Sequence, residues 1–191
     1  VAAPDAPAVY RVEIRATDDR RRPPWIRSNP IYVRGAGPAS TVTGRPAARE
    51  SQTLFDGRDA SGWRVEADPT SLVALDLIQG PEGGELRVRY GLSSGPPVRQ
   101  FAALTLFPRG GLASHDRLTF TARAERPMRI SVQLRAAVTP PQDDRWQRSV
   151  YLDTVGRGQT VYFDDFTPIG VTSTPRPPLA AVHSLVFAID T

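Results

Sequence analysis

The sequence predicts an all-β fold, an antiparallel sandwich, and three observations lead to that prediction. Short segments alternate apolar and polar residues, as half-buried strands do, because successive side chains of a strand point to opposite faces. The chain has 19 prolines and 15 glycines, many of them in the polar stretches between these segments, where they mark turns. No stretch keeps a helical period over the ten or more residues that a helix assignment requires.

The first 53 residues are expected to form an extension and a linker. Two strand candidates, 9–15 and 25–33, are joined by the charged turn 18–24 and form a hairpin over residues 1–34. An isolated two-stranded hairpin is marginal in water, so we expect it to pack on another surface. Residues 35–53 are small, polar and interrupted by glycine and proline, which is linker composition.

The main domain is expected over residues 54–191, where strand signals recur at short intervals. In 128–135 the apolar residues occupy alternate positions and face a core, while the polar residues between them face out. Turn material such as 80–84, 93–97 and 139–144 separates the strands. The nine predicted strands are 62–66, 72–78, 85–90, 101–107, 117–124, 128–135, 148–153, 159–163 and 182–189.

Composition and charge narrow the range of partners. All 24 basic residues are arginine, cysteine is absent and Asn29 is the only asparagine, a skew typical of a GC-rich genome. The net charge is only +4, with arginines dispersed among 20 carboxylates, so we expect no nucleic-acid partner. No apolar run approaches the ~20 residues of a membrane span, although an anchor outside Val1–Thr191 is compatible with the sequence.

The sequence offers little for catalysis. His115 and His183 are far apart and have no recognisable ligand spacing, and no nucleophile elbow, phosphate loop or dinucleotide fingerprint occurs. Paired carboxylates occur at Asp143–Asp144 and Asp164–Asp165, but neighbours on a strand point to opposite faces. We therefore expect no enzyme, no cofactor and no catalytic metal.

A structural calcium ion is kept as an alternative. Calcium requires six to eight oxygen ligands, and sandwiches of this kind often hold one. Asp190 and Glu50 are the candidate contributors beside the paired aspartates.

The polar side chains that face out from the predicted strands between residues 117 and 153 form the best candidate for a ligand-binding site. Arginine and glutamine can hydrogen-bond hydroxyl or acidic groups, and tyrosine can stack on a sugar ring. The competing interpretation is an ordinary solvated face, on which the arginines pair with Glu125, Asp153 or other carboxylates. The ligand-binding candidates are Arg123, Gln133, Arg135, Gln147 and Tyr151, and the interface candidates are Trp146, Arg148, Trp25, Arg21 and Arg22.

Three segments of the main domain carry a family resemblance. Gly62–Glu66, Asp116–Arg123 and Val161–Pro168 resemble the galactose-binding-like jelly rolls of family-eleven carbohydrate-binding modules and of the related complex I intermediate-associated family. The resemblance implies a jelly-roll β-sandwich whose concave sheet binds glycans, or which acts as a scaffold or assembly factor of a membrane respiratory complex. The family pattern continues into a further strand, which is either missing here or supplied by residues 9–33.

A narrower resemblance covers the N-terminal extension. Tyr10–Ile14 and Trp25–Val33 resemble the closing strands that follow the catalytic barrel of bacterial PHP-type metal-dependent phosphoesterases. It implies an accessory domain of such an enzyme, whose histidine-rich metal site does not occur in this chain.

These observations favour a non-catalytic interaction or scaffold module that docks on a larger protein assembly. Three alternatives stay open: a glycan-binding module, a C-terminal accessory domain of a PHP-type phosphoesterase, and an accessory subunit of a respiratory or photosynthetic membrane complex. The expected location is extracytoplasmic, in the periplasm or at the surface of a GC-rich bacterium.

Overall fold

The structure is a computed structural model, and the chain in it divides into two units, residues 1–47 and 48–191. The description covers residues 8–10, 13–14, 26–27 and 31–33 of the first unit and residues 51–80, 83–93, 100–139 and 142–190 of the second. No helix in these residues is long and apolar enough to cross a membrane.

The described residues of the first unit form four short strands in two nested antiparallel pairs. Strand β1 (Ala8–Tyr10) pairs with β4 (Ile31–Val33), and β2 (Glu13–Ile14) pairs with β3 (Ile26–Arg27). The order of pairing is that of one hairpin, and the described strands fall within the two predicted segments 9–15 and 25–33 apart from Ala8. The turn 18–24 and most of the expected linker lie outside the described residues.

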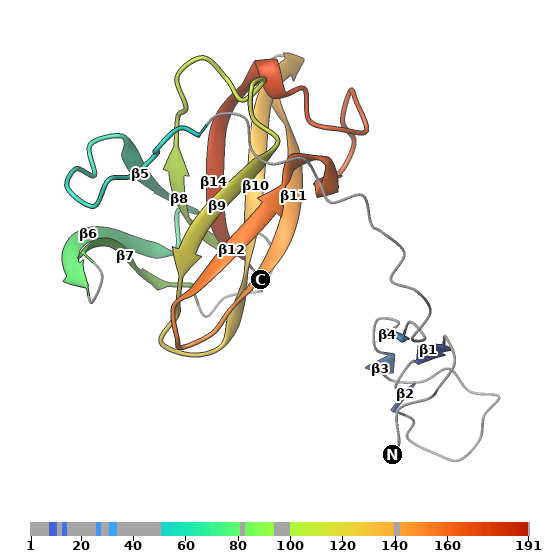
Figure 1. The fold of residues 1–191 in the computed structure, drawn as a ribbon, viewed down its shortest axis with the longest axis horizontal. Coiled ribbons are helices and arrows are strands. Elements are labelled where there is room, and N and C mark those ends of the chain that lie inside the picture. Colours follow the sequence, from blue (N-terminus) through green and yellow to red (C-terminus); the bar gives the residue numbers. More distant parts are fainter. Residues whose placement is uncertain are drawn as a thin grey trace. The chain divides into compact units, whose positions relative to one another are not determined.

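The second unit is built on a six-stranded antiparallel sheet. Its strand order is β13-β11-β10-β14-β8-β5, in which every neighbouring pair is antiparallel (Figure 1). The strands are β5 (Trp63–Ala67), β8 (Phe101–Leu106), β10 (Met128–Thr139), β11 (Gln142–Leu152), β13 (Thr167–Pro168) and β14 (Val182–Asp190).

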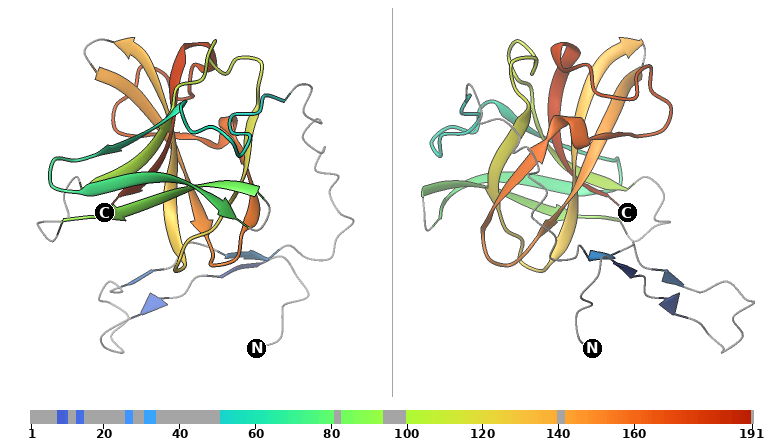
Figure 2. Two further views of the ribbon diagram at one scale, coloured as in Figure 1. Left: turned by 90° about the vertical axis from the view of Figure 1, so that its left-hand side faces the viewer. Right: turned by 45° about the vertical axis from the view of Figure 1, so that its right-hand side comes forward.

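A second layer consists of two strand pairs. Strand β9 (Arg117–Ala122) pairs with β12 (Arg157–Tyr162) and lies in front of the large sheet in Figure 1. Strand β6 (Leu72–Gly80) pairs with β7 (Gly83–Gly91) in a long hairpin that runs across the other strands (Figure 2). Two short 3-10 helices, η1 (Phe163–Asp165) and η2 (Leu179–Ala181), complete the unit.

The core lies between the large sheet and the β9–β12 pair. The apolar side chains of β10 alternate into it, and Ile130, Val132, Leu134 and Ala136 are all buried. Strands β9 and β12 contribute buried Leu118 and Val161 from the opposite side. By contrast, no described side chain of the β6–β7 hairpin is fully buried.

All nine strands predicted over 54–191 are present, and the all-β jelly-roll prediction is confirmed. The boundaries differ most at 136–147, where β10 extends to Thr139 and β11 begins at Gln142. The prolines at 140 and 141 predicted a longer turn, but the strands continue up to them. The short β13 was not predicted, because its Pro168 cannot donate a ladder hydrogen bond and is tolerated only at an edge.

Candidate binding face of the six-stranded sheet

The face of the six-stranded sheet that points away from the core carries most of the predicted ligand-binding residues. Strand pairing lines up Gln147, Gln133, Val186, Thr105 and Arg64 in one row across β11, β10, β14, β8 and β5. The row two residues further along contains Ser149, Ser131, Ala188, Ala103 and Glu66. These side chains alternate with the core residues, so they share one face.

An ion pair shows that this face is concave. Arg135 Nη1 of β10 lies 2.7 Å from Glu66 Oε2 of β5, although β14 and β8 lie between the two strands. In a flat sheet three spacings of ~4.8 Å would separate the strands by ~14 Å. The pairing also places the two residues four steps apart along the strands, ~13 Å in a flat sheet. Two side chains meet across that diagonal only if the sheet curves toward them.

Small side chains form the floor of the concave face under this ion pair. Ala103 and Thr105 of β8 and Ser184, Val186 and Ala188 of β14 are all buried. Large residues here would occupy the space that the Arg135 and Glu66 side chains cross. We call these five residues together with the ion pair the inner half of the face.

In the inner half, the charges of Arg135 and Glu66 neutralise each other. Burial raises the pKa of Glu66, but the hydrogen bond from Arg135 and the positive charges of Arg135 and Arg145 act in the opposite direction, and the net pKa is lowered. The net pKa lies below the ordinary value of 4.5. Glu66 is therefore ionised at neutral pH and serves as the counter-ion of Arg135.

The polar residues next to the floor are also bonded to one another. Ser131 Oγ donates to Gln147 Oε1 at 2.8 Å, and Gln133 Nε2 donates to Ser131 Oγ at 3.3 Å. Gln133 is only 7% exposed. These amide groups are therefore already engaged in hydrogen bonds that stabilise the face, which leaves less of their bonding capacity for a ligand.

The opposite side of the face, along β11, is exposed. Arg145 and Ser149 are exposed on this face, and Tyr151 is 50% exposed. Arg148 is also exposed, but it alternates with them and lies on the other face of β11, opposite Val132 of β10. Neither Arg145 nor Arg148 forms an ion pair with any described residue. We call these four residues the β11 edge.

A shallow depression of about 400 Å³ runs beside the β11 edge. Residues 148–151 line one side of it, and Arg157, Gln159 and Thr160 of β12 line the other. Asp153 and Asp165 add two carboxylates, and Asp153 is paired with Arg157 at 3.3 Å. The depression is therefore open and polar, with backbone of β11 at its margin.

The structure brings together four of the five predicted ligand-binding residues. Gln133, Arg135, Gln147 and Tyr151 lie on the concave face, whereas Arg123 follows β9 in the other layer. Arg123 pairs there with Glu85 of β7 at 2.6 Å, so it does not contribute to this face. Alternation assigns a side chain to a face but does not say to which sheet the strand belongs.

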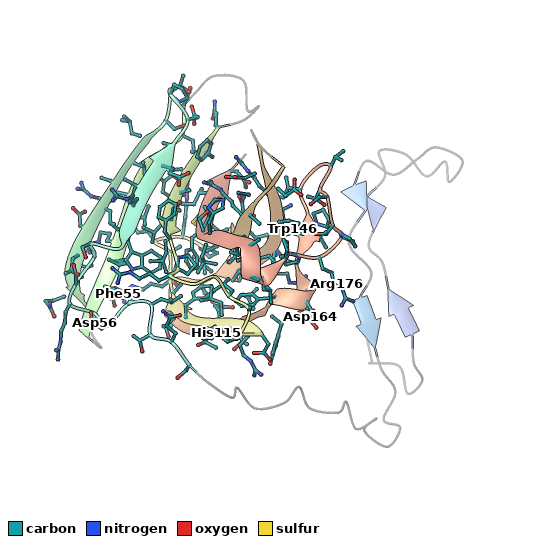
Figure 3. The ribbon with its side chains drawn as sticks, turned by 90° about the horizontal axis from the view of Figure 1, so that it is seen from above. Phe55, Asp56, His115, Trp146, Asp164 and Arg176 are labelled. Atoms are coloured by element: carbon teal, nitrogen blue, oxygen red, sulfur yellow. The ribbon has the colours of Figure 1, made fainter. Side chains whose placement is uncertain are left out.

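The structure bears differently on the five interface candidates. Trp146 is fully buried, not exposed, and its Nε1 donates to the Thr174 carbonyl at 3.2 Å (Figure 3). Arg148 is exposed on the β11 edge. Trp25, Arg21 and Arg22 lie outside the described residues. Sequence analysis missed Glu66, because nothing local to 62–66 indicates a partner 69 residues away.

Three of the titratable groups outside this face, His183, Asp143 and Asp144, have partners in the structure. His183 lies 3.2 Å from Asp143, and Asp144 accepts hydrogen bonds from Ser173 that lower the pKa of its carboxyl group. Asp164 and Asp165 lie in η1, not on a strand. In residues 51–80, 83–93, 100–137 and 143–190 no three His, Asp or Glu side chains gather into a metal site, and Glu50 is outside these ranges.

Comparisons with known proteins agree with the fold. No protein-family model matches the sequence, and no curated protein matches it. The structure is similar to the family 11 carbohydrate-binding module of the cellulosomal cellulase Lic26A-Cel5E of Clostridium thermocellum, with a TM-score of 0.62 and 15% identity over 72% of this chain and 83% of that chain.

Two further solved structures give the same result. The family 11 module from Clostridium thermocellum in complex with a β-1,3-1,4-mixed-linked tetrasaccharide matches with a TM-score of 0.61 and 14% identity over 71% of this chain and 83% of that chain. The solution structure of CtCBM11 matches at 0.59 and 15% over 73% and 86%. The likeness to the complex I intermediate-associated family and to PHP-type enzymes stays a prediction. The chain therefore has the jelly-roll fold of the family 11 carbohydrate-binding modules.

Proposed function

We propose that this chain is a non-catalytic module that docks on another protein through the β11 edge. The observation that carries the proposal is the difference between the charged side chains of the inner half and those of the β11 edge. Arg135 is committed to Glu66, whereas Arg145 and Arg148 are exposed and without an ion pair among the described residues. Arginine and tyrosine are enriched at protein interfaces, and the β11 edge presents both.

The partner we favour belongs to a larger extracytoplasmic assembly. A respiratory or photosynthetic membrane complex would be one such assembly, and a C-terminal accessory domain of a PHP-type phosphoesterase stays a separate alternative. The module would contribute binding surface to it and no chemistry, since the face offers bonded amides and arginines with no nucleophile beside a base.

Purification from the native source tests the docking proposal. We expect the tagged full-length chain to elute in a complex larger than its own 20.9 kDa. Arg148→Glu should reduce the recovered partner by at least about tenfold, because it reverses a charge at the centre of the edge. Arg87→Glu is the matched control, since Arg87 is an exposed arginine on β7. A wild-type chain that always elutes alone would overturn the proposal.

Glycan binding is the second candidate, and the exposed ring of Tyr151 favours it. Tyr151 could stack on a sugar, with the Gln147 amide on the same face and the same strand. One of the similar structures is a module in complex with a tetrasaccharide. A glycan array with wild type and Tyr151→Ala tests this candidate: binding by wild type that the substitution abolishes supports it, and a blank array for wild type rejects it.

A further inference from the structure

The backbone of β11 presents unpaired hydrogen-bonding groups beyond the point where β13 ends. The Ile169 N–H donates to the Arg145 carbonyl at 2.9 Å, so the backbone polar groups of Arg145 point away from β10. In an antiparallel strand these directions alternate from residue to residue. The register of β11 against β10 is continuous from 145 to 152, so Gln147, Ser149 and Tyr151 also direct their N–H and C=O groups away from β10.

Strand β13 covers only the start of this edge. Its two residues pair with Trp146 and Gln147, and no described strand pairs with the same side of β11 beyond them. The N–H and C=O groups of Ser149 and Tyr151 therefore face the depression of about 400 Å³ between β11 and β12. An open sheet edge beside a groove is the geometry that accepts an added strand.

We infer that the β11 edge binds an extended, acidic segment of a partner protein, which adds to the sheet beside Ser149 and Tyr151. The inference rests on the proposed docking function and names its mode. Main-chain hydrogen bonds would hold the segment, and the groove would receive alternate side chains.

The excess of positive charge around the β11 edge favours an acidic segment as the partner. Four arginines surround it, Arg129, Arg145, Arg148 and Arg157, against the two aspartates Asp153 and Asp165. A segment carrying glutamate or aspartate would meet an excess of positive charge. Two copies of this chain paired edge to edge would instead bring their arginines together, which is how native sheets discourage self-association.

Peptide titration of the full chain followed by NMR tests this inference. The probes are three capped peptides: alternating valine and glutamate, alternating valine and lysine, and the glutamate peptide with alternate amides N-methylated. We expect the acidic peptide to slow exchange of the Ser149 and Tyr151 amides at least about tenfold, and to leave Val150 and Leu152, which face β10, unchanged. The basic and N-methylated peptides should bind at least about tenfold more weakly.

Two variants with a matched control locate the binding. Ser149→Pro removes an N–H from the open side of β11 and leaves the ladder with β10 intact, so the fold should persist while peptide binding falls at least about tenfold. Arg148→Glu should weaken the acidic peptide similarly, and Arg87→Glu should not. If Ser149→Pro does not fold, the N-methylated peptide makes the same test from the ligand side.

The inference is overturned if the acidic peptide leaves the Ser149 and Tyr151 amides unchanged, if the basic peptide binds equally well, or if the chain dimerises through β11. These outcomes are distinguishable from failure of the docking proposal. A chain that ignores the peptide but still loses its native partner on Arg148→Glu docks by another mode. A chain that also elutes alone from its source does not dock at all.

Discussion

The inner half of the concave face and the β11 edge differ, although both belong to the same six-stranded sheet. On the inner half, Arg135 is 13% exposed and is bound to Glu66 over a floor of small buried residues. On the β11 edge, Arg145 and Arg148 are exposed and Tyr151 is half exposed. Both regions therefore present arginine on the same sheet, but Arg135 stabilises the module, whereas Arg145 and Arg148 are available for contact.

The difference follows from the position of the strands in the sheet. Strands β14 and β8 are central, so their outward side chains lie in the trough of a curved sheet and are buried even though they face away from the core. Strand β11 is nearly at the edge, with only two residues of β13 beside it. An outward-facing position is thus structural in the middle of this sheet and accessible at its margin.

The largest effect is expected from the core side of β11. Trp146→Ala should destabilise the second unit by about 3–5 kcal/mol, because it empties the space of a fully buried indole and removes the hydrogen bond to Thr174. Urea unfolding of the variant measures the change. A loss below ~1 kcal/mol would show that β11 is not anchored by this residue.

The arginines of the two regions should respond differently to the same substitution. Arg135→Ala leaves Glu66 without its partner in a partly buried position and should cost about 1–2 kcal/mol. Arg145→Ala should change stability by no more than ~0.5 kcal/mol. Equal losses in urea unfolding would remove the distinction between the regions, and a double-mutant cycle with Glu66→Gln would measure the coupling of the pair.

The Arg135–Glu66 pair of the inner half should also make the free energy of unfolding depend on pH. The pKa of Glu66 is lower in the folded module than its ordinary value of 4.5, so the unfolded chain binds the proton first as the pH falls. The stabilisation is fully present above pH 4.5 and is lost as the pH falls through the folded-state pKa. Glu66→Gln should therefore be less stable than wild type at neutral pH and approach it in acid. Parallel pH profiles of the two proteins would contradict this.

The smallest effect on stability is expected at the β11 edge. Tyr151→Ala removes a half-exposed ring and should change the free energy of unfolding by no more than ~0.5 kcal/mol. It should nonetheless reduce recovery of the native partner, since aromatic side chains carry much of the energy of an interface. Full partner recovery with Tyr151→Ala would place the contact elsewhere on the module.

Period-two patterning was sufficient to predict the nine strands of the second unit and which residues of β10 and β11 share a face. It could not reveal that Arg123 belongs to the other layer, or that Glu66 meets Arg135, because both depend on how distant strands are ordered in the sheets. Trp146 illustrates a second limit. A tryptophan beside a polar turn is compatible with an interface, but Trp146 belongs to the main core cluster and its Nε1 donates to the Thr174 carbonyl, a residue 28 positions away.

Amide hydrogen exchange of the chain, alone and within its purified native assembly, tests the central claim most directly. The account predicts that exchange at Ser149 and Tyr151 slows on assembly, while Ser184, Val186 and Ala188 of the inner half are protected equally in both states. Protection gained on the β6–β7 hairpin or elsewhere, with the β11 edge unchanged, would contradict it.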